Sequence, residues 1–312
     1  MIKKLSSVLL TALHFHAFSS VSLEQLIDLE KTDCLEMLLK ANEQEIWSVF
    51  LEKQAELSFK ADVPWIEAAD WWRNSRFILE IGSGNGAYLH QLAQITKTKS
   101  FLGIEKNEAF VVLANEKYDN EQMAFQVGDA EIFDKTLSGT QDLILFRHTL
   151  QHLQKPYTAL ENAWHYLAPN GYVLLMDACD KATCTSHPVD TFNATLNLLE
   201  ERNKQMLNLN RKISLDLFNK VTTSEEHFYN LFEVVFSNLD TSGQIIYQTP
   251  YFLGEAERKQ FFNHALLFLT LIHRFYNIPV DLGKAYDELK DYTNDENAWT
   301  TIGIHFLVLK KI

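Results

Sequence analysis

With 312 residues, 46% of them apolar and 22% charged, the chain has enough material for one large domain with a helical cap. A formal net charge of −13 repels phosphate backbones, which argues against a nucleic-acid partner. The three cysteines are too few for a disulfide framework. Cys179, Cys184 and His187 share one loop but lack a second ligand pair, so we expect no metal site.

The first 20 residues leave two interpretations open. Lys3 and Lys4 precede an apolar run from Leu5 to Phe18, and Ala17-Phe18-Ser19 is typical of the end of a signal peptide. The same run also fits an amphipathic first helix. It is too short for a membrane span, so no membrane anchor is expected here.

Residues 23–59 have helical periodicity, and Pro64 then interrupts the pattern before another short helix at 65–72. We therefore expect residues 1–74 to form an N-terminal helical cap. The apolar positions at helical spacing are Leu35, Leu38, Leu39, Trp47, Phe50 and Leu51.

Strands and helices alternate from Phe77 onward, which predicts a parallel α/β sheet with crossover helices on both faces. The turn Pro169-Asn170-Gly171 announces the fifth strand. The expected strands are 77–81, 101–104, 124–127, 142–146 and 172–176, and the expected helices are 87–95, 108–117 and 157–167.

The rest of the chain is less regular. We expect helices at 190–209, 255–276 and 282–289, strands at 232–236 and 244–247, and a last strand at 302–309. The last strand belongs to the same sheet in this interpretation. Residues 75–312 would then be one domain, with a helical insertion at 254–298.

Chemistry-bearing residues follow the strands. Glu80-Ile81-Gly82-Ser83-Gly84-Asn85-Gly86 runs from a strand through a tight turn into a helix, where glycines let a ligand approach the backbone and free amides point outward. On spacing alone the loop also fits a dinucleotide fingerprint. Acidic residues end the next two strands, at Glu105 and Asp129, and Arg147-His148 ends the fourth.

In this order, the motifs resemble those of class I S-adenosylmethionine (SAM)-dependent methyltransferases, most closely the small-molecule branch of ubiquinone and menaquinone biosynthesis. The resemblance covers residues 77–177 and the last strand. It implies a Rossmann-like, seven-stranded, mostly parallel sheet and SAM as cofactor. The residues that it assigns to cofactor binding are Glu80, Gly82, Ser83, Gly84, Gly86, Glu105, Lys106, Asp129, Ala130 and Arg147.

The resemblance also assigns roles within that set. The glycine loop packs against the methionine part of SAM, and Glu80 orients the loop and the amino group. Glu105 holds the ribose, while Asp129 and the backbone of Ala130 contact adenine. Arg147 and His148 lie near the methyl group.

Methyl transfer from a sulfonium is a direct displacement, so the protein mainly aligns the nucleophile. We expect an oxygen or nitrogen of a small, apolar or aromatic metabolite as acceptor, with His148 as the candidate base. Asp177, Tyr157 and His187 are weaker candidates, and His152 has a structural role in this interpretation.

Two other functions stay open. One is a protein methyltransferase, which would be secreted if residues 1–20 are a signal peptide. The other is a NAD(P)-dependent oxidoreductase, whose Tyr-x-x-x-Lys pattern occurs after the fifth strand only at Tyr286 and Lys290, far along the chain from that strand. SAM is made in the cytosol, which favours a cytoplasmic enzyme unless residues 1–20 are a signal peptide.

The helix at 255–276 is apolar on more than one stripe, so it needs a second surface to pack against. We expect residues 254–298 to form a lid over the acceptor pocket. A fully packed helical subdomain or a homodimer interface would satisfy the same pattern.

Overall fold

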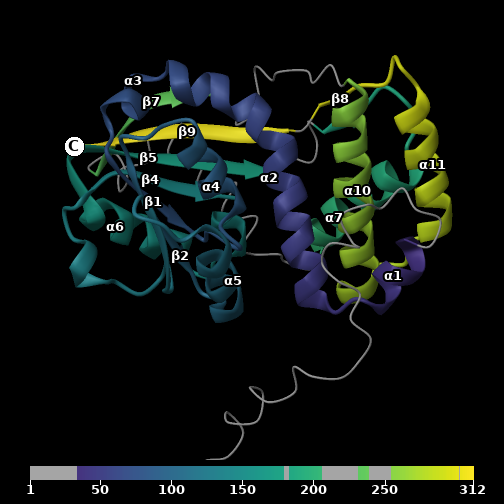
Figure 1. The fold of residues 1–312 in the computed structure, drawn as a ribbon, viewed down its shortest axis with the longest axis horizontal. Coiled ribbons are helices and arrows are strands. Elements are labelled where there is room, and N and C mark those ends of the chain that lie inside the picture. The colour runs from purple at the N-terminus through teal and green to yellow at the C-terminus, as the bar shows by residue number, and fades with distance from the viewer. Residues whose placement is uncertain (1–33, 179–182, 206–230, 239–253, 302) are drawn as a thin grey trace, which may run out of the picture.

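The computed structural model describes residues 34–178, 183–205, 231–238, 254–301 and 303–312. An α/β sheet with its covering helices stands beside a block of helices, and the long helix α2 runs between the two (Figure 1). Within the described ranges, no helix is long and apolar enough to cross a membrane.

The sheet has seven strands in the order β3-β2-β1-β4-β5-β9-β7. The first five strands along the chain pair in parallel, and β9 pairs antiparallel with both β5 and β7. The expected seven-stranded, mostly parallel sheet is confirmed; the strand expected at 244–247 lies outside the described residues. The strands are β1 (Phe77–Ile81), β2 (Ser100–Glu105), β3 (Met123–Val127), β4 (Gln141–Arg147), β5 (Leu167–Ala178), β7 (Phe232–Ser237) and β9 (Ile304–Lys311).

Helices cover both faces of this sheet because its strands are apolar on both sides. Along β1, Ile78 belongs to the core under α2–α5, whereas Leu79 belongs to the core under α6. One face carries α2 (Glu43–Ala68), α3 (Asp70–Asn74), α4 (Ala87–Gln94) and α5 (Glu108–Tyr118), and the other carries α6 (Pro156–Tyr166).

A third hydrophobic core lies in the helical block. It joins α1 (Cys34–Lys40) and the first half of α2 with α7 (Asp190–Gln205), α10 (Glu255–Phe275) and α11 (Leu282–Asn294). Helix α10 is the centre of this core: Phe261, Phe262 and Leu266 are almost fully buried. The short strands β6 (Cys184–Thr185) and β8 (Thr300–Thr301) pair beside it. Two 3-10 turns, η2 (Lys135–Leu137) and η3 (Leu150–His152), follow β3 and β4.

Two local predictions were wrong. Pro64 does not end a helix, because α2 continues through it to Ala68. Proline removes one backbone hydrogen bond, but burial of Asp62 and Ile66 on either side holds the helix against the sheet. The turn Pro169-Asn170-Gly171 does not precede β5 but lies inside it, as a bulge where the pairing with β4 shifts register.

Candidate active site

The glycine loop between β1 and α4 has a left-handed backbone that favours glycine. The φ angles of Gly82, Gly84 and Gly86 are +77°, +53° and +79°. A Cβ atom on Gly84 would lie 2.9 Å from Leu51 Cδ1 of α2, and one on Gly82 would collide with Thr149. The loop is therefore enclosed between α2 and the end of β4, with its backbone at the surface of a cavity.

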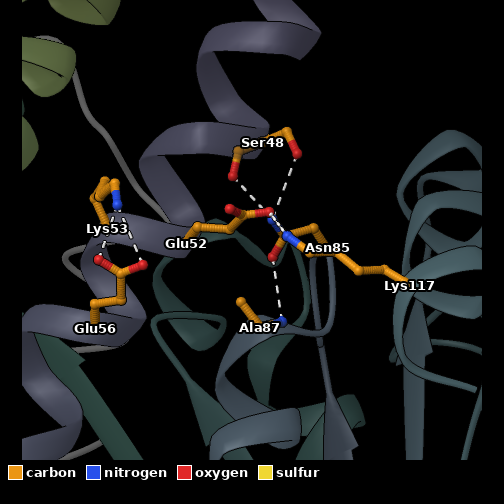
Figure 2. A network of polar contacts seen from close by, with 7 residues as sticks. All are labelled: Ser48, Glu52, Lys53, Glu56, Asn85, Ala87 and Lys117. Carbon is orange, nitrogen blue, oxygen red and sulfur yellow. Dashed lines mark hydrogen bonds and ion pairs between the residues drawn. The ribbon is translucent and has the colours of Figure 1, made fainter. Parts of the chain in front are cut away.

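Helix α2 is fastened to this loop by hydrogen bonds. Asn85 Nδ2 donates to the Ser48 carbonyl at 2.8 Å, and Asn85 Oδ1 accepts from the Ala87 amide at 3.3 Å (Figure 2). Farther along α2, Glu52 pairs with Lys117 of α5 at 2.5 Å. Helix α2 thus connects the glycine loop to α5 and forms one wall of the site.

The acidic residues at the ends of β2 and β3 also face this edge. Glu105 accepts from the Gly84 amide at 3.0 Å and from the Asn107 amide at 2.8 Å, which ties the glycine loop to the turn after β2. Asp129 Oδ2 lies 2.8 Å from Lys106 Nζ. The hydrogen bond from Lys106, with a second from the Glu131 amide, lowers the pKa of Asp129.

Charged groups are buried where β1 and β4 end. Burial raises the pKa of Glu80 to about 7, although the positive charge of Arg147 opposes the rise. Burial likewise raises the pKa of Asp62 to about 6. The Arg147 guanidinium lies 4.1 Å from the centre of the Tyr88 ring and donates to Ser58 Oγ at 2.6 Å. Tyr88 donates to Asp62 Oδ2 at 3.0 Å, which links the helix α2 residues to this charge cluster.

His148 follows β4 in a left-handed conformation, with φ of +50°. Its Nδ1 lies 4.0 Å from Asp177 Oδ1 at the end of β5, so these two candidates are neighbours. His187 lies elsewhere, 3.4 Å from Asp295, and neither His187 nor Tyr157 lines the cavity described next.

One cavity of 1170 Å³ joins these features. His148 lines it, and so do all but one of the residues predicted to bind the cofactor; the exception is Gly86, where a Cβ would collide with Phe125 and Ala114 beneath the loop. Asp177 does not line the cavity either. Its opposite wall comes from α2, α7, α10 and the residue after α10 and is largely apolar: Trp47, Phe50, Leu51, Leu199, Phe268, Leu271, Ile272 and Tyr276. Helix α2 also contributes the polar side chains of Glu43, Gln44 and Gln54 to this wall.

Residues 79–175, which hold the glycine loop and the following strand ends, match the family described as "Methyltransferase domain". The chain contains a class I SAM-dependent methyltransferase domain. SAM is accordingly the cofactor of this enzyme. No curated protein matches the chain significantly.

Solved structures that match the chain include the CMeT domain of the citrinin polyketide synthase, at 21% identity over 33% of this chain and 29% of that one, with a TM-score of 0.31. A TehB-like SAM-dependent methyltransferase from Corynebacterium glutamicum is 20% identical over 33% and 55% of the two chains, with a TM-score of 0.30. The [4+2]-cyclase SpnF aligns over 76% of this chain and 75% of its own at 15% identity, with a TM-score of 0.41.

Several residues beside the methyltransferase site were not predicted from the sequence. Ser58, Asp62 and Tyr88 lie on helices without a motif, and their place beside Arg147 depends on how α2 and α4 pack. Asn85 lies inside the glycine loop, between Gly84 and Gly86. That position is the one feature of the sequence that could have predicted a role for Asn85 at the site.

No group of three or more potential metal ligands occurs among the residues that the structure describes. The weak zinc pattern included Cys179, which lies outside the described residues. Cys184 contacts Thr301 across the small sheet, with its sulfur 2.9 Å from Oγ1.

Proposed function

We propose that this enzyme transfers the methyl group of SAM to an oxygen or nitrogen of a small, apolar or aromatic metabolite. The observation that carries the proposal is the single cavity that joins the glycine loop to an apolar helical wall. Its 1170 Å³ exceed the ~300–1,000 Å³ typical of one small-ligand site. A cofactor and an acceptor therefore fit side by side.

Unsatisfied buried atoms support a cofactor in the half of the cavity nearest the sheet. Glu80 Oε2, Ser83 Oγ and Arg147 Nε are buried and have no hydrogen-bond partner within the described part of the chain. All three residues line the cavity. Buried polar groups are nearly always paired in native proteins, so these atoms fit a bound ligand with donors and acceptors of its own.

The roles in this half follow from position and charge. In this proposal Glu80 would hold the cofactor's ammonium group, with Gly82 and Gly84 giving backbone access beside it. Glu105 would accept from the ribose hydroxyls, since each carboxylate oxygen keeps a free lone pair after its backbone bond. Asp129 would accept from the adenine amino group.

Neighbouring residues complete the proposed cofactor half. Lys106 holds the Asp129 carboxylate in place at 2.8 Å, and the backbone of Ala130 reads the adenine edge. Arg147 keeps Glu80 partly ionised by its positive charge. SAM supplies an activated methyl group, so the protein needs to align the acceptor behind it and exclude water.

His148 is the proposed base for an oxygen acceptor. It lines the cavity, and Asp177 Oδ1 lies 4.0 Å from its Nδ1, so Asp177 would orient the ring. In this scheme the acceptor's proton passes to the imidazole as the new bond to carbon forms.

We also propose that residues 1–74 are a cap on the domain 75–312 and that the insertion 254–298 closes the acceptor pocket. The support is that α2 from the cap and α10 from the insertion both line the cavity. They also share one hydrophobic core, so neither is expected to act as a loose flap.

A binding and turnover experiment tests the proposed function. Calorimetry and thermal shift should show binding of SAM and of its demethylated product S-adenosylhomocysteine, and no comparable effect of NAD. Incubation of the enzyme with isotopically labelled SAM and a metabolite extract, followed by mass spectrometry, should yield a labelled small molecule. Stabilisation by NAD instead of SAM, or label found on proteins alone, would contradict the proposal.

A further inference from the structure

Helix α10 carries two kinds of side chain toward α2. Near its C-terminal end, Phe268 and Ile272 line the cavity. One turn before Phe268, the ring of His264 stacks on Phe50, with centroids 4.9 Å apart and planes 23° from parallel. Phe50 itself lines the cavity, so His264 lies directly behind that wall, although His264 is not one of the residues that line the cavity.

Three polar side chains occur together in the first half of α10. Gln260 Oε1, Asn263 Oδ1 and His264 Nδ1 are buried and have no hydrogen-bond partner in the ranges that the structure covers. Their spacing of three and four residues places them on one side of the helix. An unpaired buried polar atom lowers stability, so three on one helical face fit groups that form their hydrogen bonds with a bound molecule.

The chemistry of these groups limits what they can bind. Burial and, secondarily, the charge of Arg147 lower the pKa of His264 to about 4, so the imidazole is neutral at physiological pH. The unpaired oxygens of Gln260 and Asn263 accept hydrogen bonds, and the charge of Arg147 disfavours a cation nearby. An uncharged group such as a hydroxyl fits this setting, since its one hydrogen can be donated to one of these acceptors.

We propose that Gln260, Asn263 and His264 form a polar subsite of the acceptor pocket, and that the acceptor is an amphipathic alcohol or phenol. Its hydroxyl binds at this subsite, and its apolar body lies along Phe268 and Ile272. The inference rests on the proposed methyl transfer and deepens it, since it selects an uncharged oxygen acceptor.

A ligand-free melting experiment separates a reserved binding group from a structural one. His264→Phe keeps a ring stacked on Phe50 and removes the unpaired nitrogen, so it should raise the Tm of the apoprotein by roughly 2–4 °C. The matched control is His273→Phe on the same helix, because His273 Nδ1 accepts from the Val280 amide at 3.2 Å and its loss should lower the Tm. A fall in Tm for both variants would make His264 structural and overturn the proposal.

A binding experiment tests the ligand chemistry directly. The probes are 2-naphthol and 2-methylnaphthalene, which match in size and differ in the hydroxyl, titrated by fluorescence into enzyme saturated with S-adenosylhomocysteine. We expect about tenfold tighter binding of 2-naphthol to the natural chain. His264→Phe should abolish that preference with unchanged affinity for S-adenosylhomocysteine.

The outcomes distinguish the two levels of the proposal. If S-adenosylhomocysteine does not bind the natural chain, the proposed methyl transfer is wrong, and the proposed subsite is then wrong as well. If it binds but 2-naphthol does not, or binds no tighter than 2-methylnaphthalene, the subsite alone is wrong. A naphthol preference that survives His264→Phe and Asn263→Leu also overturns it.

Discussion

The buried carboxyl of Glu80 gives a direct test of whether a group placed for ligand binding lowers the free energy of unfolding. Glu80 is 2% exposed, and burial raises its pKa from 4.5 to about 7. The native protein therefore keeps a proton on Glu80 between these pH values, where the unfolded chain has lost it. Since the native state binds more protons there, the free energy of unfolding must fall as pH rises from 4.5 through 7.

The size of the effect follows from the same two values. At about 1.36 kcal/mol for each pH unit, the difference between 4.5 and about 7 amounts to roughly 3 kcal/mol, fully present below pH 4.5 and lost above pH 7. Glu80→Gln replaces the carboxyl with an amide that cannot ionise. The variant should match the natural chain within about 1 kcal/mol at pH 5 and exceed it by roughly 3 kcal/mol at pH 8.

Urea unfolding of the ligand-free proteins at pH 5, 6.5 and 8 measures this difference. Glu121→Gln is the control, because Glu121 is exposed and does not line the cavity. Equal destabilisation of Glu80→Gln at pH 5 and pH 8 would refute the reasoning, since Glu80 would then hold the fold together. The same variant should bind SAM more weakly at pH 8, where the natural carboxylate is ionised.

Three further predictions concern the site. Glu105→Ala should weaken SAM binding by about 1.5–3 kcal/mol, measured by calorimetry beside a melting curve; unchanged affinity in a folded variant would assign Glu105 to loop support alone. Gly84→Val should block SAM binding, because φ is +53° and Leu51 leaves no room for the side chain. Normal SAM affinity in that variant would show that the ligand lies elsewhere. His148→Ala should lower kcat about 10²–10⁴-fold with SAM affinity nearly unchanged, and full activity would rule out a base at this position.

The sequence by itself determined the sheet and the edge where the site lies. Strands such as 77–81 and helices such as 108–117 are set by local periodicity, and the structure places them within one residue of their expected ends. The residues after successive parallel strands, from Glu80 to His148, meet at one edge because the topology brings those strand ends together.

The tertiary structure alone decided the electrostatics and the second wall of the cavity. Asp62 on α2, Tyr88 on α4 and His264 on α10 are far apart in sequence and belong to no motif, so their approach to Arg147 depends on how the helices pack. Packing also overrode a local signal, as α2 passes through Pro64 to reach the sheet. The raised pKa of Glu80 exists because those helices exclude water from the end of β1, and no local pattern encodes that exclusion.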